Sequence, residues 1–458
     1  MHVGVSSSLT VFLLVAIAPM ALAAQPATTP TQVSFRRDIA PILVRQCQGC
    51  HGPEKTKSAY RLDTFTRLMI PGKNKAAPIT PGHPDRSEIY RLITAKDEDD
   101  RMPKDGDPLK PAQAEAFRRW ILAGAKFDSP DPAAPLASII EDTEHPPAPV
   151  VYPRPTPITS IAFSPDGKTL AASGYHEISL WDPADGRLRG RIDRLAERTY
   201  ALAYSPDGTH LAAACGSPGL LGEVLLIDLT TTPPALRTLD RIGDVMLAVR
   251  FSPDGKHLAA AGADNAIRLY SLPSAKRDLV IEQHADWVLD LFFSPDSTRI
   301  ASASRDKSAR VFDVKTGAMI SSFLGHEEIV AAVAWSADGK HVYSAGRDHS
   351  VRVWTPADAK QTGQIKGLDA DPLKLETSQG KLFVVCTAGG SLSAYADDDK
   401  HELLRHYAPT PDWTYCLAID PKNHHLATGS HNGQIHLFNL DAAKPLRAFT
   451  AAPGFTPR

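Results

Sequence analysis

Apolar residues recur at helical spacing in two short segments of the amino-terminal third of the chain. In the first segment the apolar positions follow i, i+4, i+7 and i+8 and are occupied by Phe35, Ile39, Ile42 and Leu43. In the second segment, which begins at Pro111, the apolar positions are Ala114, Phe117, Trp120 and Ile121. This spacing places the apolar side chains of each segment on one helix face. The sequence therefore predicts two amphipathic helices, and the second is expected to end at Gly124.

From residue 156 onward, apolar and polar residues alternate in short runs, as in strands that bury one face. A Ser-Pro-Asp-Gly turn, complete or nearly so, follows an aromatic residue at Phe163, Tyr204, Phe251, Phe293 and Trp335. Degenerate copies follow at 378–380 and 419–423. Successive copies are 41 or 42 residues apart, apart from one step of 47. The pattern predicts seven repeats, each built of short strands.

These patterns divide the 458 residues into several units, because the chain is too long for one small domain. We expect a small all-α domain at 33–127 and an all-β region at 156–451. Prolines are dense between them at 128–155, which predicts a semi-rigid tether. The hydrophobic content of 43% and charged content of 22% are those of a soluble globular protein. A formal net charge of −2 argues against nucleic-acid binding, which needs a concentrated basic surface.

An apolar run from Thr10 to Leu22 ends in an alanine-rich segment, the pattern of a secretory signal peptide at 1–24. The run is too short for a comfortable membrane span, and no other segment is long and apolar enough to cross a bilayer. We therefore expect a periplasmic or otherwise exported protein whose mature chain has no membrane span. The residues before Thr10 contain no Lys or Arg, so an uncleaved amino-terminal anchor is the competing interpretation.

The sequence Cys47-Gln48-Gly49-Cys50-His51 is typical of a covalent c-type haem site. Two thiols three residues apart lie on one side of a helical turn and can form thioethers with one porphyrin. The imidazole of His51 is then placed to bind the iron as the proximal ligand. A zinc site would need about four ligands, and the chain has no second Cys-x-x-Cys. A thioredoxin-like pair would lie in a βαβ context, which the sequence does not suggest.

The sixth iron ligand has two candidates. Met102 precedes the second predicted helix, where a loop can fold over the distal face of the haem. A thioether there would raise the reduction potential, whereas a second histidine would lower it. His83, within Pro81-Gly82-His83-Pro84, is the rival candidate. The third alternative is a sixth coordination position that no side chain of the protein occupies.

The amino-terminal domain resembles the cytochrome c domains of planctomycete-type proteins. The matching stretches are Phe35–Gly52, Tyr60–Asp63, Pro81–Ser87, Arg101–Pro103 and Trp120–Ala125. The resemblance implies that His51 and Met102 are the axial pair. Lys104 stands where a second proline is usual, and His83 stands where an acidic residue is common, which keeps His83 as a rival ligand.

The repeats resemble WD40 blades, and seven blades of four strands would form a closed β-propeller. In the fifth repeat the family's hydrogen-bonded tetrad would be formed by His326, Ser344, Asp348 and Trp354. The fourth repeat retains the tetrad but has Phe312 in place of the tryptophan. The first, second and sixth repeats lack most of it, so we expect them to depend on apolar packing. The fold class is thus a multidomain chain: a small all-α cytochrome c domain and an all-β seven-bladed WD40-type propeller.

The combination predicts an exported electron-transfer protein with one covalent haem c and its iron, which meets redox partner proteins. The propeller is expected to be a docking scaffold, because no Ser/His/Asp or paired-carboxylate arrangement stands out. Trp287 and Trp413 occupy equivalent places near the rim, where they either pack between blades or contact a protein partner. Two alternatives stay open: an oxidoreductase with a substrate site in the propeller, and a non-catalytic scaffold or haem sensor. The remaining cysteines are expected to be buried thiols: Cys215, Cys386 and Cys416.

Overall fold

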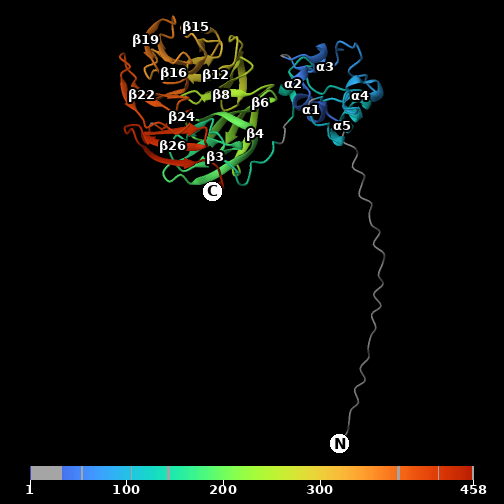
Figure 1. The fold of residues 1–458 in the computed structure, drawn as a ribbon, viewed down its shortest axis with the longest axis horizontal. Coiled ribbons are helices and arrows are strands. Elements are labelled where there is room, and N and C mark those ends of the chain that lie inside the picture. Colours follow the sequence, from blue (N-terminus) through green and yellow to red (C-terminus); the bar gives the residue numbers. More distant parts are fainter. Residues whose placement is uncertain are drawn as a thin grey trace.

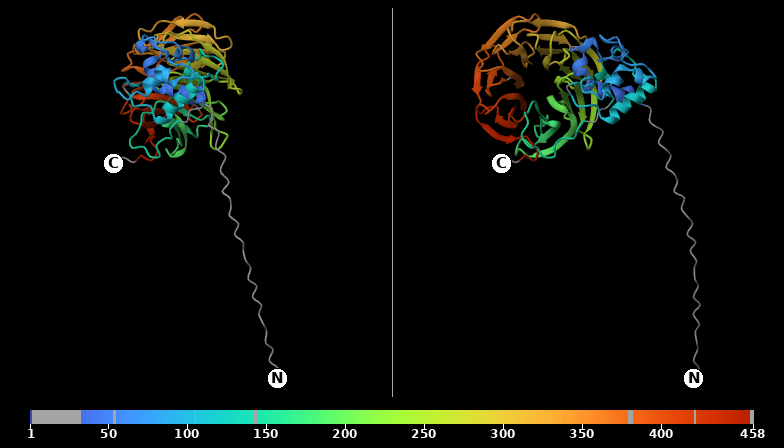
Figure 2. Two further views of the ribbon diagram at one scale, coloured as in Figure 1. Left: turned by 90° about the vertical axis from the view of Figure 1, so that its right-hand side faces the viewer. Right: turned by 45° about the vertical axis from the view of Figure 1, so that its right-hand side comes forward.

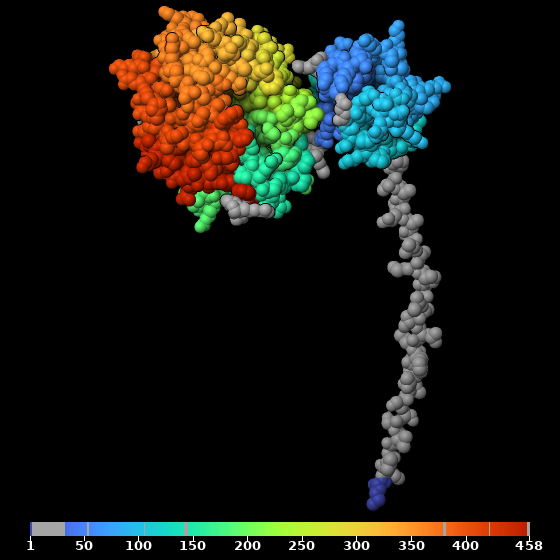
Figure 3. Space-filling model, viewed as in Figure 1, coloured from blue at the N-terminus to red at the C-terminus, as the bar shows by residue number. Residues whose placement is uncertain are grey.

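The computed structural model describes residues 1, 33–52, 55–104, 106–141, 145–378, 382–420 and 422–455. The predicted signal peptide at 1–24 lies outside the described residues, except for Met1. Within these ranges no helix is both long enough and apolar enough to span a bilayer. The chain consists of a small helical amino-terminal region and a larger β region (Figure 1). In the space-filling view the helical region forms a lobe at the side of the β region (Figure 3).

The helical region consists of short helices joined by long loops. Its helical elements are η1 Phe35–Ile39, α1 Ala40–Gln46, α2 Gln48–His51, η2 Lys57–Ala59, α3 Phe65–Leu68, η3 Pro84–Arg86, α4 Glu88–Ile93, α5 Pro111–Leu122 and α6 Leu136–Ile139. At the start of η1 the hydroxyl of Ser34 accepts a hydrogen bond from Arg37 N at 3.1 Å, which caps the helix. Both predicted helices are confirmed, and the second ends where Gly124 adopts a φ of +92°.

An aromatic cluster holds the two ends of this region together. The ring of Phe35 lies 5.3 Å from that of Trp120 and 5.0 Å from that of Phe65, while Phe65 packs at 4.5 Å from Phe127. The indole of Trp120 donates to the Lys126 carbonyl at 2.9 Å, so its buried N–H is satisfied. The apolar face predicted for each helix therefore meets that of the other in one core.

The segment expected to be a tether begins by packing on the helical region. The short helix α6 contributes Leu136 and Ile139 to the same core, and Ile140 follows it there. The Leu136 amide donates to the Asp63 carbonyl at 2.8 Å. Burial of these apolar side chains fixes residues 136–140 to the helical region.

Strands make up nearly all of the β region. Seven strands form one sheet, in the order β1 Ile161–Phe163, β2 Leu170–Ser173, β3 Tyr175–Trp181, β4 Leu188–Tyr204, β5 His210–Ser217, β6 Leu221–Asp228 and β7 Ala235–Ile242. The next two sheets are four-stranded and contain β8 Met246–Phe251, β9 His257–Gly262, β10 Ile267–Ser271 and β11 Lys276–Ile281, then β12 Val288–Phe293, β13 Arg299–Ser304, β14 Ala309–Asp313 and β15 Met319–Phe323. Two further sheets contain β16 Val330–Trp335, β17 Val342–Gly346, β18 Ser350–Trp354 and β19 Gln361–Lys366, then β20 Pro372–Ser378, β21 Leu382–Thr387, β22 Leu392–Ala396 and β23 Leu403–His406. The last sheet contains β24 Thr414–Asp420, β25 His425–Ser430, β26 Gln434–Asn439 and β27 Pro445–Thr450.

Every sheet pairs strands that are consecutive in the chain, all antiparallel. The first sheet contains two repeats joined through β4, whose first half pairs with β3 and whose second half pairs with β5. The sheets follow one another around a common centre (Figure 2, right). The first strands of successive repeats, β4, β8, β12, β16, β20 and β24, contact one another in that order, and β1 contacts both β24 and β4.

The recurring Ser-Pro-Asp-Gly turns join the first and second strands of the repeats. In the third repeat the hydroxyl of Ser252 donates to Asp254 at 2.7 Å and accepts from His257 N at 2.9 Å. Gly255 has a φ of +71°, the left-handed conformation that glycine adopts without strain. The fourth repeat places Ser297 at this position with a φ of +62°, and its hydroxyl accepts from Asp254 N of the preceding repeat at 3.1 Å.

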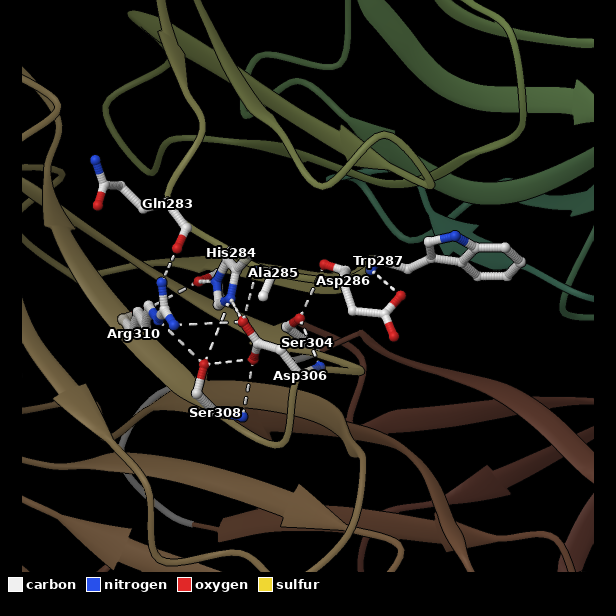
Figure 4. Close-up of polar contacts among 10 residues, drawn as sticks. Gln283, His284, Ala285, Asp286, Trp287, Ser304, Asp306, Ser308 and Arg310 are labelled. Carbon is white, nitrogen blue, oxygen red and sulfur yellow. Dashed lines mark hydrogen bonds and ion pairs between the residues drawn. The ribbon is translucent and has the colours of Figure 1, made fainter. Parts of the chain in front are cut away.

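The predicted tetrad of the fifth repeat forms as expected. Nδ1 of His326 lies 3.0 Å from Asp348, Nε2 lies 2.9 Å from Ser344, and the Trp354 indole donates to Ser344 at 3.2 Å. In the fourth repeat His284 lies 2.8 Å from Asp306 and 2.7 Å from the Ser302 hydroxyl. Figure 4 shows His284 facing Asp306 within a network that also contains Ser308 and Arg310. These bonds satisfy polar groups that would otherwise be buried without partners.

The first and second repeats depart from the expectation that apolar packing replaces the tetrad. Each holds a buried ion pair in addition to its apolar core. Glu177 on β3 pairs with Arg191 on β4, and Glu223 on β6 pairs with Arg241 on β7. The sequence pattern missed these pairs because single Glu and Arg residues in strands carry no recognisable motif.

Candidate functional site

The helical region encloses a mostly apolar cavity of about 310 Å³. Cys47, His51 and Met102 all line it, although 55 positions separate the first from the last. The apolar part of the wall includes Leu62, Pro78, Ile89, Leu92 and Ile93. Cys50 is half-buried on the same helical turn but is not among the lining residues. The structure therefore brings together three of the four haem-binding residues that the sequence predicts and places the fourth beside them.

The helical turn that carries the cysteines is held by its own backbone. The amides of Cys50 and His51 both donate to the Cys47 carbonyl at 3.1 Å. This turn begins where α1 ends, so the first predicted helix delivers the two thiols and the imidazole to the cavity. Since Cys47 and Cys50 are three positions apart on one turn, their side chains project to the same side.

One hydrogen bond sets the tautomer of His51. Its Nδ1 lies 3.2 Å from the backbone carbonyl oxygen of Tyr60. Because a carbonyl can only accept, Nδ1 carries the proton and Nε2 keeps its lone pair. A second bond, from the Leu62 amide to the His51 carbonyl at 2.9 Å, holds the same two segments together. Histidines that bind a metal commonly donate their other ring N–H in this way, which fixes the ring and strengthens the ligand.

Tyr60 helps to orient His51, a role that the sequence alone did not indicate. It lies within the matching stretch Tyr60–Asp63, but its contact with His51 uses the main chain, which any residue could supply. Its hydroxyl donates to the Leu68 carbonyl at 2.9 Å. The side chain thus anchors the strand-like segment whose carbonyl orients the imidazole.

Met102 reaches the cavity from a loop that follows α4. Its amide donates to the Leu92 carbonyl at 3.1 Å, which ties the loop to the end of that helix. The Arg101 amide donates to the Asp97 carbonyl at 3.0 Å and closes the turn before it. The thioether is half-buried and shares the cavity with His51.

The rival ligand His83 lies elsewhere. It is exposed at the start of η3 and is not among the residues that line the cavity. Its main chain serves a local turn, because its carbonyl accepts from the Ser87 hydroxyl at 2.9 Å.

The donors and walls of the cavity suit a haem group. A thiol, an imidazole with a free Nε2 and a thioether meet an apolar lining, which is the chemistry that a c-type haem requires. A Cβ atom on Gly72 would lie 2.8 Å from the Ser58 carbonyl oxygen, so glycine lets these two parts of the wall close on each other. Burial raises the pKa of the Cys47 thiol to about 12, whereas reactive thiol pairs depend on a lowered pKa. In the described ranges no three His, Cys, Asp or Glu side chains form a group that could hold a metal ion.

The centre of the β region holds a second cavity, of about 430 Å³. Two ion pairs cross it between repeats that are not neighbours. Arg250 on β8 lies 2.5 Å from Glu376 on β20, and Lys374 on β20 lies 2.5 Å from Asp290 on β12. These four charges satisfy one another and leave none of the four free for a charged ligand.

Trp287 and Trp413 make equivalent main-chain contacts in their repeats. The Arg305 amide donates to the Trp287 carbonyl, and the His431 amide donates to the Trp413 carbonyl, both at 2.9 Å. The Arg305 guanidinium covers the Trp287 ring at 4.3 Å, and Figure 4 shows this ring pointing away from the His284 network. Trp413 is 56% exposed and lies beside Tyr415. Trp413 is therefore the more accessible of the two for a partner.

The other cysteines agree with the sequence expectation. Cys215, Cys386 and Cys416 are free and buried within strands.

Two family models match parts of the chain. The family model described as Planctomycete cytochrome C matches residues 47–106, the span from Cys47 past Met102. The model described as WD domain, G-beta repeat matches residues 151–182, 236–271, 276–313, 317–355 and 401–439. No curated protein matches the sequence.

Proposed function

Because the chain joins a cytochrome c domain of planctomycete type to a WD40 region, we propose that it is an exported c-type cytochrome with one covalent haem. Haem supplies an iron that gains and loses one electron at a time. The observation that carries the proposal is the convergence of Cys47, His51 and Met102 on one apolar cavity.

In this proposal the chain's own residues hold and tune the group. Cys47 and Cys50 provide the thioether bonds, and His51 provides Nε2 as the proximal ligand. The Tyr60 carbonyl keeps the imidazole in the tautomer that leaves this nitrogen free. Met102 provides the distal thioether, which favours a higher reduction potential than a second histidine would. The apolar wall limits access of water to the site, which further tunes the potential.

The WD40 region is proposed to be a closed seven-bladed propeller that docks a redox partner. The six sheets of the described residues, which follow one another around a common centre (Figure 2), support it, as do the contacts that β1 makes with both β24 and β4. The exposed Trp413 offers an aromatic contact at the rim. The charges paired across the central cavity count against the alternative of a substrate site there. A Trp413→Ala variant of the full chain should lose partner cross-linking that the wild type retains.

Export to the periplasm or beyond is part of the same proposal. The apolar run from Thr10 to Leu22 supports it, and covalent haem attachment outside the cytoplasm fits the Cys47–His51 motif. Sequencing the amino terminus of the mature chain tests it, and a start near residue 24 is expected. A chain that keeps Met1 would favour the uncleaved anchor.

The ligand assignment is tested by absorption spectroscopy of the protein matured with haem. Met102→Ala should remove the thioether–iron band at the red edge of the spectrum, while His83→Ala should retain it. Loss of the band with His83→Ala alone would contradict Met102 and favour His83 as the sixth ligand. Retention of the band in both variants would remove Met102 as the distal ligand.

A further inference from the structure

Two glutamates of the β region are buried almost completely, and the segment that joins the two domains binds both. The Glu223 side chain is 1% exposed and the Glu177 side chain is 0% exposed. A carboxylate so deeply buried is stable only when charged and hydrogen-bonded partners surround it. For both residues, part of that surrounding comes from residues 145–152.

Glu223 on β6 holds the first contact. Nε2 of His145 lies 2.6 Å from one carboxylate oxygen, and Nε of Arg241 lies 2.9 Å from the other. The Arg241 guanidinium also donates to the Ile140 carbonyl at 2.8 Å. Burial acts to raise the pKa of Glu223, but the hydrogen bonds and charges of His145 and Arg241 outweigh it, so the pKa lies below its usual value. The carboxylate therefore binds one side chain of the connecting segment and one of the β region.

Glu177 on β3 holds the second contact in the same way. The Tyr152 hydroxyl donates to one carboxylate oxygen at 2.7 Å, and Arg191 lies 2.5 Å from the other. The Arg191 guanidinium donates to the carbonyls of Pro149 at 2.6 Å and Val150 at 3.2 Å.

The two contacts share the same arrangement of residues. In each, the glutamate is on the third strand of its repeat and the arginine is on the fourth. Each glutamate accepts from one side chain of the connecting segment, and each arginine donates to its main-chain carbonyls. The first and second repeats, which lack the tetrad, thus use the same part of the blade to bind the connecting segment.

The other end of the segment is fixed to the helical domain. Nε of Arg36 donates to the Ile139 carbonyl at 2.9 Å. Residues 139 and 140 are consequently held by Arg36 from one domain and Arg241 from the other. At the same boundary the haem-binding turn approaches the β region, because a Cβ atom on Gly243 would lie 3.4 Å from Nε2 of Gln48. Figure 1 shows α2 on the side of the helical region that faces β6.

We propose that residues 139–141 and 145–152 of the connecting segment brace the two domains rather than tether them, and that Glu177 and Glu223 are positioning residues. Together they hold the Cys47–His51 turn in one orientation against the rim between β7 and β8. This arrangement concerns the protein architecture and does not depend on the redox role. It predicts that a partner meets both domains as one surface.

Pulsed electron spin resonance between two nitroxides in the full, haem-loaded chain tests the brace. Arg67→Cys in the helical domain and Lys315→Cys in the β region provide exposed label positions. The wild-type background should give one narrow distance distribution. Glu177→Gln/Glu223→Gln should broaden it severalfold, because the isosteric amides cannot hold both arginines and both segment donors.

A second variant covers the case in which the buried glutamines disturb folding. His145→Ala/Tyr152→Phe changes only the connecting segment and should also broaden the distribution. Asp182→Asn is the matched control, because Asp182 pairs with Arg189 in the same sheet without touching the segment. The tryptophan bands of the near-ultraviolet circular dichroism spectrum should remain unchanged in the segment variant and in the control. A broad distribution in the wild-type background, or equally narrow ones in both double variants, would overturn the proposal.

Discussion

Nδ1 of His51 lies 3.2 Å from the main-chain carbonyl oxygen of Tyr60, and this contact decides which ring nitrogen carries the proton. We expect His51→Ala to abolish the low-spin iron spectrum of the haem-loaded protein, because no other imidazole lines the described cavity. Tyr60→Phe is the matched control. It removes only the hydroxyl bond to Leu68 and should keep the spectrum while lowering the free energy of unfolding by about 1 kcal/mol. A low-spin spectrum that survives in His51→Ala would contradict the ligand assignment.

The ion pair between Arg250 and Glu376 joins repeats on opposite sides of the β region. Glu376→Gln removes the charge that the guanidinium faces, so we expect the free energy of unfolding to fall by about 1.5 to 3 kcal/mol. Glu402→Gln breaks an exposed contact with Lys400 and should change the free energy of unfolding by less than about 0.5 kcal/mol. Urea unfolding followed by tryptophan fluorescence measures both. Equal effects would show that the pair across the centre contributes no more than a surface pair.

The fourth and fifth repeats offer an internal comparison of the tetrad. Ser344→Ala removes the partner of both His326 and Trp354, and we expect a loss of about 2 to 3 kcal/mol in the free energy of unfolding. Ser302→Ala removes the partner of His284 but no indole, since Phe312 occupies the tryptophan position, and should cost about 1 to 2 kcal/mol. Chemical denaturation of both variants tests this order, and a larger loss for Ser302→Ala would contradict it.

The tetrad histidine makes stability depend on pH. Burial lowers the pKa of His326 below its usual 6.5, although Asp348 acts in the opposite direction. The unfolded chain therefore binds a proton at a pH where the folded chain does not, and the stabilising contribution is lost as pH falls from 6.5 through the folded pKa. The free energy of unfolding of the wild type should fall relative to that of His326→Gln between about pH 7 and about pH 5. The fall should be at most about 1.4 kcal/mol per pH unit. A difference in unfolding free energy that stays constant over this range would contradict the expectation.

Local patterns predicted much of this fold. The apolar spacing predicted α1 and α5, the turn residues predicted the strand ends, and the family resemblance predicted the tetrad of the fifth repeat. These predictions succeeded because each depends on residues close in sequence or on a repeated motif. The helical turn at Cys47–His51 belongs to the same class, since it lies within five consecutive residues.

Contacts between distant residues could not be predicted in this way. Arg250 and Glu376 are 126 positions apart, and His145 and Glu223 are 78 positions apart. Neither pair forms a motif, and a charged residue in a strand looks the same in sequence whether it faces water or a buried partner. The connecting segment was predicted to be a tether because its prolines indicate extended backbone, whereas its hydrogen bonds to the β region use the Ile140 carbonyl and the side chains of His145 and Tyr152.

Covalent attachment of haem to Cys47 and Cys50 is measured most directly by haem peroxidase staining of the matured chain on a denaturing gel. The wild type should stain at the mass of the full chain, and Cys47→Ala/Cys50→Ala should not stain. Cys215→Ala, which removes a buried thiol far from the cavity, should stain like the wild type. A wild-type band without stain, in cells that attach haem to other cytochromes, would contradict the assignment of this chain as a c-type cytochrome.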